Sequence, residues 1–517
     1  MRAWFRLSRR LGWLLLYFPL AVWLATSLSG QRASAQSSSV GQWSAVQTWP
    51  VVAVHAHLLP TGKVMFHPYS DGIRQWDPAD GTITSLANCG YNLFCSGHSY
   101  VSDGRLFVTG GHIANNVGLP NASYYNPFTN SWTRVADMNA GRWYPTNTTL
   151  ANGDVLVVTG DADVGVNNDL PQVWQVGSGT WRSLTNARLV QPLYARMFLA
   201  PNGQVFFAHD TSRYLNTSGT GSWTTVGSMR QSGRSNYGSA VMYEPGKIMA
   251  AGGADPPVAS AEVIDLNAST PAWSFTGSMA TPRRQLNLTI LPDGRVLATG
   301  GSSGSGFNNS SAPVHSAEVW NPATGSWTTW ASCTRYRGYH STALLLPDGR
   351  VLCAGGDNEP NAEVFSPPYL FSGTRPTISS APSTVNYGQT FFLGTPDATS
   401  IAKISFIRLG SVTHAFNQNQ RLNWLTFSQT SGGLHVTVPS SGNLCPPGHS
   451  MLFLLNGSNI PSVAKIIRIH AGLPSPWRNR DVGPVAIAGS ASYSGGTFTV
   501  TGSGADIWST ADEFHFV

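Results

Sequence analysis

Charged residues are scarce in this chain of 517 residues, at 11% of the total. Glycine, proline and tryptophan are numerous by contrast, at 54, 33 and 18 residues, and this composition favours short strands and tight turns over helices. Residues 1–35 contain five arginines and no acidic residue, so the net charge of +6 falls to +1 for the rest of the chain. The chain after residue 35 is therefore nearly neutral, which gives no electrostatic support for a nucleic-acid partner.

Cysteine is also sparse, with five residues in the whole chain. An odd number in an exported protein leaves one cysteine unpaired or used for another purpose. If Cys95 is committed to another bond, then Cys89, Cys333, Cys353 and Cys445 remain for disulfides, and their connectivity stays open.

Residues 1–35 predict an export signal. Arg9 and Arg10 precede an apolar run from Leu11 to Leu28, and Ala33-Ser34-Ala35 fits a cleavage site of small residues. The alternative is an uncleaved anchor, because the apolar run is nearly long enough to span a bilayer. We therefore expect a secreted or extracytoplasmic protein, which contacts a membrane only if the leader is retained.

A repeated hairpin unit fills residues 36–368. Each unit joins two apolar strands through a turn that often reads Asp-Gly or Asn-Gly, which are strong hairpin signals. The turn glycines recur about 42 to 55 residues apart, which is the period of kelch-type blades. They are Gly62, Gly104, Gly153, Gly203, Gly246, Gly294 and Gly349. We therefore predict an all-β fold that begins with a seven-bladed kelch-type β-propeller.

A tryptophan follows each of the first six hairpins, and we expect it on the outer strand of its blade. These residues are Trp76, Trp132, Trp181, Trp223, Trp273 and Trp327. Residues 362–367, which follow the seventh hairpin, contain none, whereas Trp43 precedes the first hairpin. We predict that the N-terminal strand completes the last blade, which closes the ring and protects its edges.

The hairpin repeat stops after Pro368. Residues 369–470 alternate as short strands and predict a small antiparallel β-sandwich. Residues 471–517 predict the incomplete start of a further β domain.

Four separate segments carry side chains that together suit a copper ion. Tyr339 and His340 place a phenol beside an imidazole, Tyr144 adds a second phenol, and His414 adds a second imidazole. Cys95 supplies a thiol. Two phenolates and two imidazoles form a mixed oxygen and nitrogen set that fits Cu(II) in tetragonal geometry.

Together these segments resemble the galactose oxidase/glyoxal oxidase family of copper radical oxidases. The resemblance runs from about residue 40 to about residue 470 and is closest in Arg142–Thr146, Arg337–Ser341 and Pro446–Phe453. It implies that the sandwich of residues 369–470 is immunoglobulin-like (E-set).

The resemblance implies that Cys95 and Tyr144 are joined by a thioether, and that this linked tyrosine is the radical that stores one oxidising equivalent. Cys95 lies just before the second hairpin and Tyr144 just before the third, so they occupy the same point of adjacent blades. The alternative is a disulfide between Cys95 and another cysteine, with Cys89 nearby, and simple core packing for Tyr144.

The resemblance also implies that Tyr144, Tyr339, His340 and His414 bind the copper ion. His340 corresponds to an equatorial ligand, and Tyr339 to the axial ligand and the base that takes the substrate proton. His414 corresponds to the imidazole that a hairpin of the C-terminal domain delivers through the propeller channel. Taken alone, the Tyr339-His340 pair would more often be structural.

Several positions depart from galactose oxidase. Gly160-Asp161-Ala162 lacks the tryptophan that stacks on the linked tyrosine, and Trp143 is the candidate replacement. Ser302 and His315 stand where the resemblance places a glutamine and a phenylalanine of the sugar site. These changes favour small aldehydes or primary alcohols, as in glyoxal oxidase-like members. We expect His57, His98, His112 and His209, which also lie near blade turns, to be surface or hydrogen-bonded residues.

We therefore predict an exported copper-dependent alcohol/aldehyde oxidase with one copper ion and a Cys95–Tyr144 thioether-linked tyrosyl radical. It would oxidise a small alcohol or aldehyde with O2 and produce hydrogen peroxide, with carbohydrate as a further candidate partner and no nucleic acid. The alternative function is a metal-free kelch propeller that binds carbohydrate or protein, because a fold does not determine a function.

Overall fold

A computed structural model of the chain describes residues 37–470 and the later segments 480–482, 490–494, 497–502, 506–508 and 511–516. The leader predicted for residues 1–35 lies outside the described residues. None of the helices that are described has both the length and the apolar character needed to cross a membrane.

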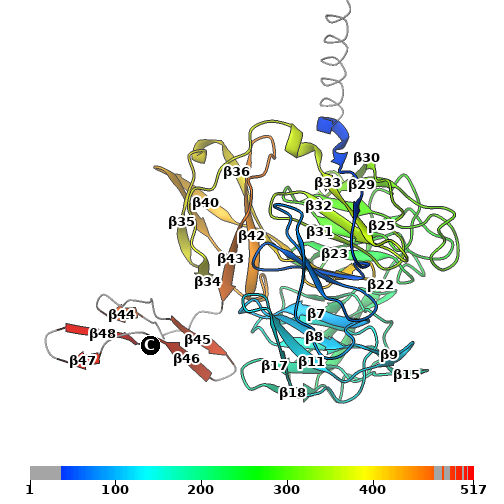
Figure 1. Ribbon diagram of the computed structural model, residues 1–517, viewed down its shortest axis with the longest axis horizontal. Coiled ribbons are helices and arrows are strands. Elements are labelled where there is room, and N and C mark those ends of the chain that lie inside the picture. The colour runs from blue at the N-terminus through cyan, green and yellow to red at the C-terminus, as the bar shows by residue number, and fades with distance from the viewer. Residues whose placement is uncertain are drawn as a thin grey trace, which may run out of the picture.

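Each predicted hairpin glycine joins the first two strands of its own antiparallel sheet, and these sheets are the blades of a β-propeller (Figure 1). Blade one has β3 (His55–Leu58), β4 (Val64–His67), β5 (Arg74–Trp76) and β6 (Ile83–Ser85). Blade two has β7 (Ser96–Tyr100), β8 (Leu106–Gly110), β11 (Ala122–Asn126) and β12 (Ser131–Arg134). Blade three has β13 (Thr146–Thr149), β14 (Val155–Val158), β17 (Gln172–Gln175) and β18 (Thr180–Ser183).

The later blades repeat this order of strands. Blade four has β19 (Met197–Leu199), β20 (Val205–Phe207), β21 (Thr211–Asn216) and β22 (Ser222–Ser228). Blade five has β23 (Ser239–Glu244), β24 (Lys247–Ala251), β25 (Ala261–Asp265) and β26 (Ser274–Phe275). Blade six has β27 (Asn287–Ile290), β28 (Val296–Thr299), β29 (Ser316–Asn321) and β30 (Ser326–Ser332). Blade seven has β31 (Ser341–Leu345), β32 (Val351–Gly355) and β33 (Asn361–Ser366).

The N-terminal strands complete blade seven, as the tryptophan pattern predicted. β1 (Gln42–Trp43) and β2 (Gln47–Thr48) both pair antiparallel with β33, and Trp43 lies opposite Phe365. The last blade therefore combines strands from the two ends of the propeller, which closes the ring without leaving an unpaired edge on β33.

The repeated tryptophans pack between neighbouring blades. The indole N–H groups of Trp132, Trp181 and Trp223 each donate to a carbonyl just after the outer strand of the preceding blade. These tryptophans lie on β12, β18 and β22, which are outer strands as expected. The expectation is wrong for Trp76, which lies on β5, because a further strand, β6, forms the edge of blade one, and Trp273 lies just before the outer strand β26.

Residues 369–470 form the predicted β-sandwich (Figure 1). One sheet contains β34 (Thr384–Asn386), β43 (Lys465–His470), β42 (Gly448–Asn456), β36 (Ile401–Arg408) and β39 (Leu422–Trp424). The other contains β35 (Thr390–Gly394), β41 (Gly433–Thr437) and β40 (Thr426–Thr430). The 3-10 helices η1 (Pro368–Phe371) and η2 (Ala398–Ser400) flank these strands. The alternating apolar residues of both sheets meet in one buried core.

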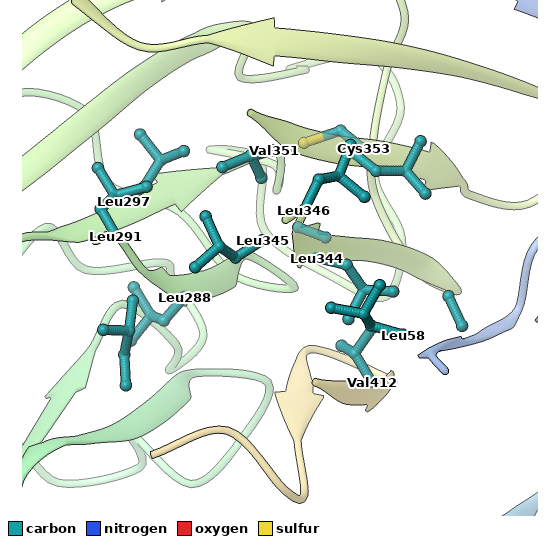
Figure 2. Close-up of a cluster of buried hydrophobic side chains, with 14 of the residues drawn as sticks. Leu58, Leu288, Leu291, Leu297, Leu344, Leu345, Leu346, Val351, Cys353 and Val412 are labelled. Carbon is teal, nitrogen blue, oxygen red and sulfur yellow. The ribbon is translucent and has the colours of Figure 1, made fainter. Parts of the chain in front are cut away.

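A hairpin of the C-terminal domain enters the propeller. β37 (Ser411–Thr413) and β38 (Phe416–Asn417) follow β36, and β37 pairs antiparallel with β3, so that Thr413 lies opposite His55. Figure 2 shows Val412 of β37 close to Leu58 and Leu344, all three of which are buried. Burial of one such aliphatic side chain stabilises the fold by about 1.5–3 kcal/mol, so the hairpin holds the two domains together.

Polar side chains just after this hairpin accept hydrogen bonds from the backbone N–H groups of the inner strands of the propeller. Gln418 accepts hydrogen bonds from the backbone N–H groups of His98 and Asn147, which lie in two different blades. Gln420 accepts from the N–H of Ile290. An unpaired buried N–H group destabilises the fold. The side-chain amides of Gln418 and Gln420 therefore fix how deeply the hairpin inserts into the propeller.

Of the further β domain predicted for residues 471–517, only strands are described. They are β44 (Arg480–Val482), β45 (Ser490–Ser494), β46 (Thr497–Thr501), β47 (Asp506–Trp508) and β48 (Ala511–Phe516). They pair in the order β44-β48-β47 and as the hairpin β45-β46. Two small hairpins also extend from the propeller: β9 (His112–Ala114) with β10 (Val117–Gly118), and β15 (Asp161–Asp163) with β16 (Val166–Asn167).

Candidate metal centre

One position, nine residues before the hairpin glycine, recurs in six blades with a left-handed backbone. The residues are Cys95, Tyr144, Tyr194, Tyr237, Gln285 and His340, and their φ values lie between 48° and 66°. Left-handed φ is uncommon for bulky residues and indicates strain that the surrounding structure must hold. The N–H of Tyr144 donates to the carbonyl of Cys95 (2.8 Å), and that of Tyr194 to the carbonyl of Tyr144 (2.9 Å). Neighbouring blades therefore hold this backbone in place.

Two phenols and two imidazoles meet at this position. The hydroxyl oxygens of Tyr144 and Tyr339 are 2.9 Å apart, and Nε2 of His340 is 3.4 Å from the Tyr144 oxygen. The ring centroid of His414 is 4.3 Å from that of Tyr144 and 4.5 Å from that of His340. The structure thus brings together the four side chains that the sequence predicted as metal ligands.

Both imidazoles are oriented through their Nδ1 atoms. Nδ1 of His340 lies 2.6 Å from Asp357, and Nδ1 of His414 lies 2.6 Å from the hydroxyl of Thr413. That hydroxyl donates its own proton to the carbonyl of Val54, so it accepts from His414. The proton of each ring is thereby placed on Nδ1, which leaves the lone pair on Nε2, the arrangement typical of metal-binding histidines.

This donor set fits a metal ion. Nε2 of His414 is buried and has no hydrogen-bond partner, so it is an unused lone pair beside the two phenols. Burial lowers the pKa of both His340 and His414, which keeps them neutral, as metal ligands must be. Burial raises the pKa of Tyr144 and Tyr339 above the ordinary value, so a nearby cation is needed to make them phenolates. The described residues contain no metal-binding group of three or more His, Cys, Asp and Glu side chains.

Cys95 and Trp143 complete the surroundings of Tyr144. Cys95 is fully buried in the same apolar cluster as Tyr144, and burial raises the pKa of its thiol. The indole of Trp143 stacks on the Tyr144 ring, with centroids 3.7 Å apart and planes inclined by 10°. A tryptophan therefore stacks on Tyr144 in this chain, which agrees with the suggestion from the sequence that Trp143 replaces the absent one.

A pocket of about 550 Å3 opens onto this centre, a size typical of small-molecule sites. Its wall includes Tyr144, Tyr339 and His414, together with Tyr194 and Tyr237. The last two residues were not identified from the sequence, although they share the nine-residue spacing with Cys95 and Tyr144. Their rings lie beside the two phenols: the Tyr194 ring is 4.6 Å from that of Tyr144, and the Tyr237 ring is 5.9 Å from that of Tyr339.

The sequence assignment of His315 to the wall of the site is wrong. The ring of His315 lies beside Cys333, with Nδ1 and Sγ 3.9 Å apart, and it is not among the residues that line the pocket. Ser302 is buried under the same loop and donates to the carbonyl of Asn309. Phe307, at the tip of that loop, instead contacts the ring of Tyr339 with centroids 4.7 Å apart.

The cysteines considered for disulfides are all free thiols in the structure. Cys89 lies beside Tyr91 in blade two, whereas Cys333 and Cys353 are buried near the last two blades and Cys445 lies in the core of the sandwich. Three of these four thiols are thus buried among other side chains rather than paired.

Comparisons with known proteins agree with this geometry. Residues 375–469 match the family description "Galactose oxidase-like, Early set domain", residues 249–369 match "Glyoxal oxidase N-terminus", and residues 99–139 match "Kelch motif". The chain is 31% identical to a galactose oxidase of Gibberella zeae over 84% of this chain and 72% of that protein. It is 29% identical to the aldehyde oxidase GLOX of Vitis pseudoreticulata over 80% of this chain and 90% of that protein.

A solved structure has the same overall architecture. It is a fungal alcohol oxidase of the AA5 family in complex with copper, with a TM-score of 0.76 and 26% sequence identity. The likeness covers 83% of this chain and 100% of that one, so it includes both the propeller and the sandwich.

Proposed function

The chain belongs to the galactose oxidase/glyoxal oxidase family, and we propose that it is a copper radical oxidase acting on primary alcohols or small aldehydes. Tyr144, Tyr339, His340 and His414 would hold one copper ion, and Cys95 would be linked to Tyr144 as the radical cofactor. The observation that carries the proposal is the meeting of two phenol oxygens with two imidazoles whose Nδ1 atoms are held by oxygen partners, with Nε2 of His340 facing Tyr144 and Nε2 of His414 unpartnered.

Copper in this site would act as a Lewis acid toward the substrate oxygen and as an acceptor of one electron. The side chains supply the remaining steps. Tyr339, whose oxygen is 2.9 Å from that of Tyr144, faces the pocket and takes the substrate hydroxyl proton. The oxidised Tyr144 ring then takes a hydrogen atom from the substrate carbon. The two electrons and two protons removed from the substrate convert O2 to hydrogen peroxide.

The pocket supports a small substrate. Aromatic rings form much of its wall, and Phe307 packs against the ring of Tyr339, one of these residues. Ser302 and His315, the positions compared with the sugar site, do not line the pocket: Ser302 donates to the carbonyl of Asn309, and His315 lies beside Cys333. Small aldehydes, through their hydrates, and primary alcohols therefore suit this site better than galactose.

The test is a substrate panel with peroxide detection on purified protein loaded with copper under oxygen. We expect one copper ion per chain and peroxide from small aldehydes or primary alcohols. The intact mass should fall by about two hydrogens, because thioether formation removes one from each partner. Cys95→Ser is the matched control: it should bind copper but keep its full mass and lose activity. A parent protein that binds no copper would favour the metal-free binding module.

We also propose that the protein is exported through residues 1–35. The support is the arginine pair, the apolar run and the small-residue tripeptide of that segment. N-terminal sequencing of protein recovered outside the cytoplasm should begin near residue 36. Recovery of the intact leader in a membrane fraction would instead indicate an anchor.

A further inference from the structure

His112 contacts the surroundings of Tyr144 from outside the pocket. The Nε1–H of Trp143 donates to Nδ1 of His112 at 3.1 Å, and the same Nδ1 is 3.8 Å from Sγ of Cys95. His112 is half-buried on β9, and it is not among the residues that line the pocket. The sequence indicated only that it would be a surface or hydrogen-bonded residue, so this contact is a property of the fold.

The backbone holds the His112 ring at this place. Its N–H donates to the carbonyl of Asn92 at 3.1 Å, and the preceding residue, Gly111, donates to the carbonyl of Arg142 at 3.3 Å. A Cβ on Gly111 would come within 2.4 Å of the Asn92 carbonyl oxygen, so only glycine permits this approach. The ring of Phe94 lies 5.2 Å from the imidazole on another side.

We propose that His112 is a positioning residue, which fixes the Trp143 indole over Tyr144 and thereby makes Tyr144 easier to oxidise. The hydrogen bond holds the indole in the parallel stack described above, with centroids 3.7 Å apart. An indole whose N–H is shared with an acceptor has a more electron-rich ring, and such a ring stabilises an electron-poor neighbour across a stack. The inference rests on the proposed function, because it concerns the radical form of Tyr144.

Two further facts agree with an acceptor role for His112. Burial lowers the pKa of His112, so its Nδ1 lone pair is available at neutral pH. The Cys95 sulfur also lies within reach of the Trp143 indole N–H, but sulfur is a weak acceptor. Before the thioether forms, the Cys95 thiol faces the same nitrogen. A thioether sulfur carries no hydrogen, so Cys95 can no longer donate to Nδ1 once the link is made, whereas the indole still can.

The test uses His112→Leu and His112→Asn, which have side chains of nearly the same shape. Leucine removes the acceptor, whereas the amide oxygen of asparagine replaces Nδ1. In copper-free protein, the indole N–H resonance of Trp143 is identified as the one absent from Trp143→Phe. It should move in the leucine variant and stay near the parent position in the asparagine variant.

In the copper-loaded protein, the midpoint potential of the Tyr144 radical should rise in His112→Leu and return toward the parent in His112→Asn. We expect up to a tenfold change in the ratio of oxidised to reduced form, which is about 59 mV for a one-electron couple. Copper content and the two-hydrogen mass loss should be those of the parent. If the leucine variant misfolds, His112→Ala gives the same comparison at this half-exposed position.

The outcomes separate this inference from the proposed function. A parent protein without the thioether or the radical contradicts the proposed function itself. If the parent forms the radical and His112→Leu has the same midpoint potential and the same indole resonance as the parent, the role of His112 is overturned. Equal shifts in the leucine and asparagine variants would also overturn it, because they would reflect side-chain size and not hydrogen-bond acceptance.

Discussion

Two groups of histidines lie close together in this protein and are used differently. The histidines proposed as copper ligands, called the ligand histidines below, are His340 and His414. The buried histidine group is His55, His57, His67 and His98, of which every member is at most 1% exposed. The rings of His55 and His414 are only 6.0 Å apart, so the two groups share one region of the channel.

The difference lies in what the rings face. In the buried histidine group the imidazoles contact each other: His55 and His67 stack at 4.2 Å, and Nδ1 of His55 is 3.1 Å from Nε2 of His98. Each ligand histidine instead faces the phenols of Tyr144 and Tyr339. Neighbouring phenols, more than the number of imidazoles or an oxygen partner at Nδ1, therefore distinguish the proposed metal centre.

One short strand organises both groups. Ser411 and Thr413 lie two residues apart on β37, so their side chains point to the same face. The Ser411 hydroxyl is 2.8 Å from His57 and 2.6 Å from His98, whereas the Thr413 hydroxyl holds His414. The hairpin from the C-terminal domain thus sets the boundary between the two groups.

The largest expected effect is the loss of a ligand histidine. His340→Ala and His414→Ala should each weaken copper binding at least about a thousandfold, because each removes one of the two imidazoles that would hold the ion. His57→Asn is the control from the buried histidine group, since its amide can still reach Ser411, and it should bind one copper ion. Copper content after dialysis against a graded chelator measures both. Equal copper loss in His57→Asn would contradict the claim that only the ligand histidines bind the copper ion.

The next effect concerns Tyr339, which lies at the pocket beside the ligand histidines. Tyr339→Phe should lower kcat by about 10²–10⁴-fold, the usual range for removal of a general base, while copper stays bound. Tyr237→Phe is the control, because Tyr237 also lines the pocket and its ring lies 5.9 Å from Tyr339. Steady-state peroxide production and metal analysis are measured together. Parent turnover in copper-loaded Tyr339→Phe would contradict the role of base.

A smaller effect is expected at Asp357. Asp357→Asn keeps the side-chain size but replaces the carboxylate that accepts from His340 Nδ1, and the amide can present its NH2 to that nitrogen instead. Loss of such an outer partner typically costs 10–100-fold in metal affinity. Asp357 also accepts from Tyr69 and Asn308, so Tyr69→Phe is a control that removes one neighbouring bond and leaves the carboxylate. Unchanged affinity in Asp357→Asn would show that the carboxylate does not orient His340.

The sequence could predict the blades because turn chemistry is local. Each Asp-Gly or Asn-Gly turn specifies its own hairpin, and the position of Trp43 revealed how the ring closes. The four candidate ligands and Cys95 were found because their segments are short and match a family in order. Cys95, Tyr144 and His340 converge because they share the position that recurs in six blades, Tyr339 is next to it, and the hairpin of β37 and β38 adds His414.

The rest depended on contacts that no local pattern encodes. Asp357 holds His340 because blade seven folds back on itself, and Tyr194 reaches the pocket through a left-handed backbone. His315 was misplaced because the loop before it is pinned by a bridge between Ser302 and Pro313. That bridge sends the tip of the loop, with Phe307, to Tyr339 instead.

The smallest effect separates the two groups by their response to acid. Burial lowers the pKa of His67 to about 3, from an ordinary value of 6.5. The folded state therefore keeps His67 neutral while the unfolded state binds a proton, so stability falls as the pH drops from 6.5 toward 3. One such histidine contributes a slope of up to about 1.4 kcal/mol per pH unit in that window.

His67→Gln removes this titration and keeps a polar side chain of similar length. Urea unfolding of copper-free parent and variant at several pH values between 6.5 and 4 should show the parent losing stability more steeply. The two curves should run parallel above pH 7, where His67 is neutral in both the folded and the unfolded state. Because the ligand histidines are identical in both proteins, the difference in slope reports only on the buried histidine group. Parallel curves across the acid range would mean that His67 gains a proton in the folded state as readily as in the unfolded one. Burial would then not keep this histidine neutral in acid.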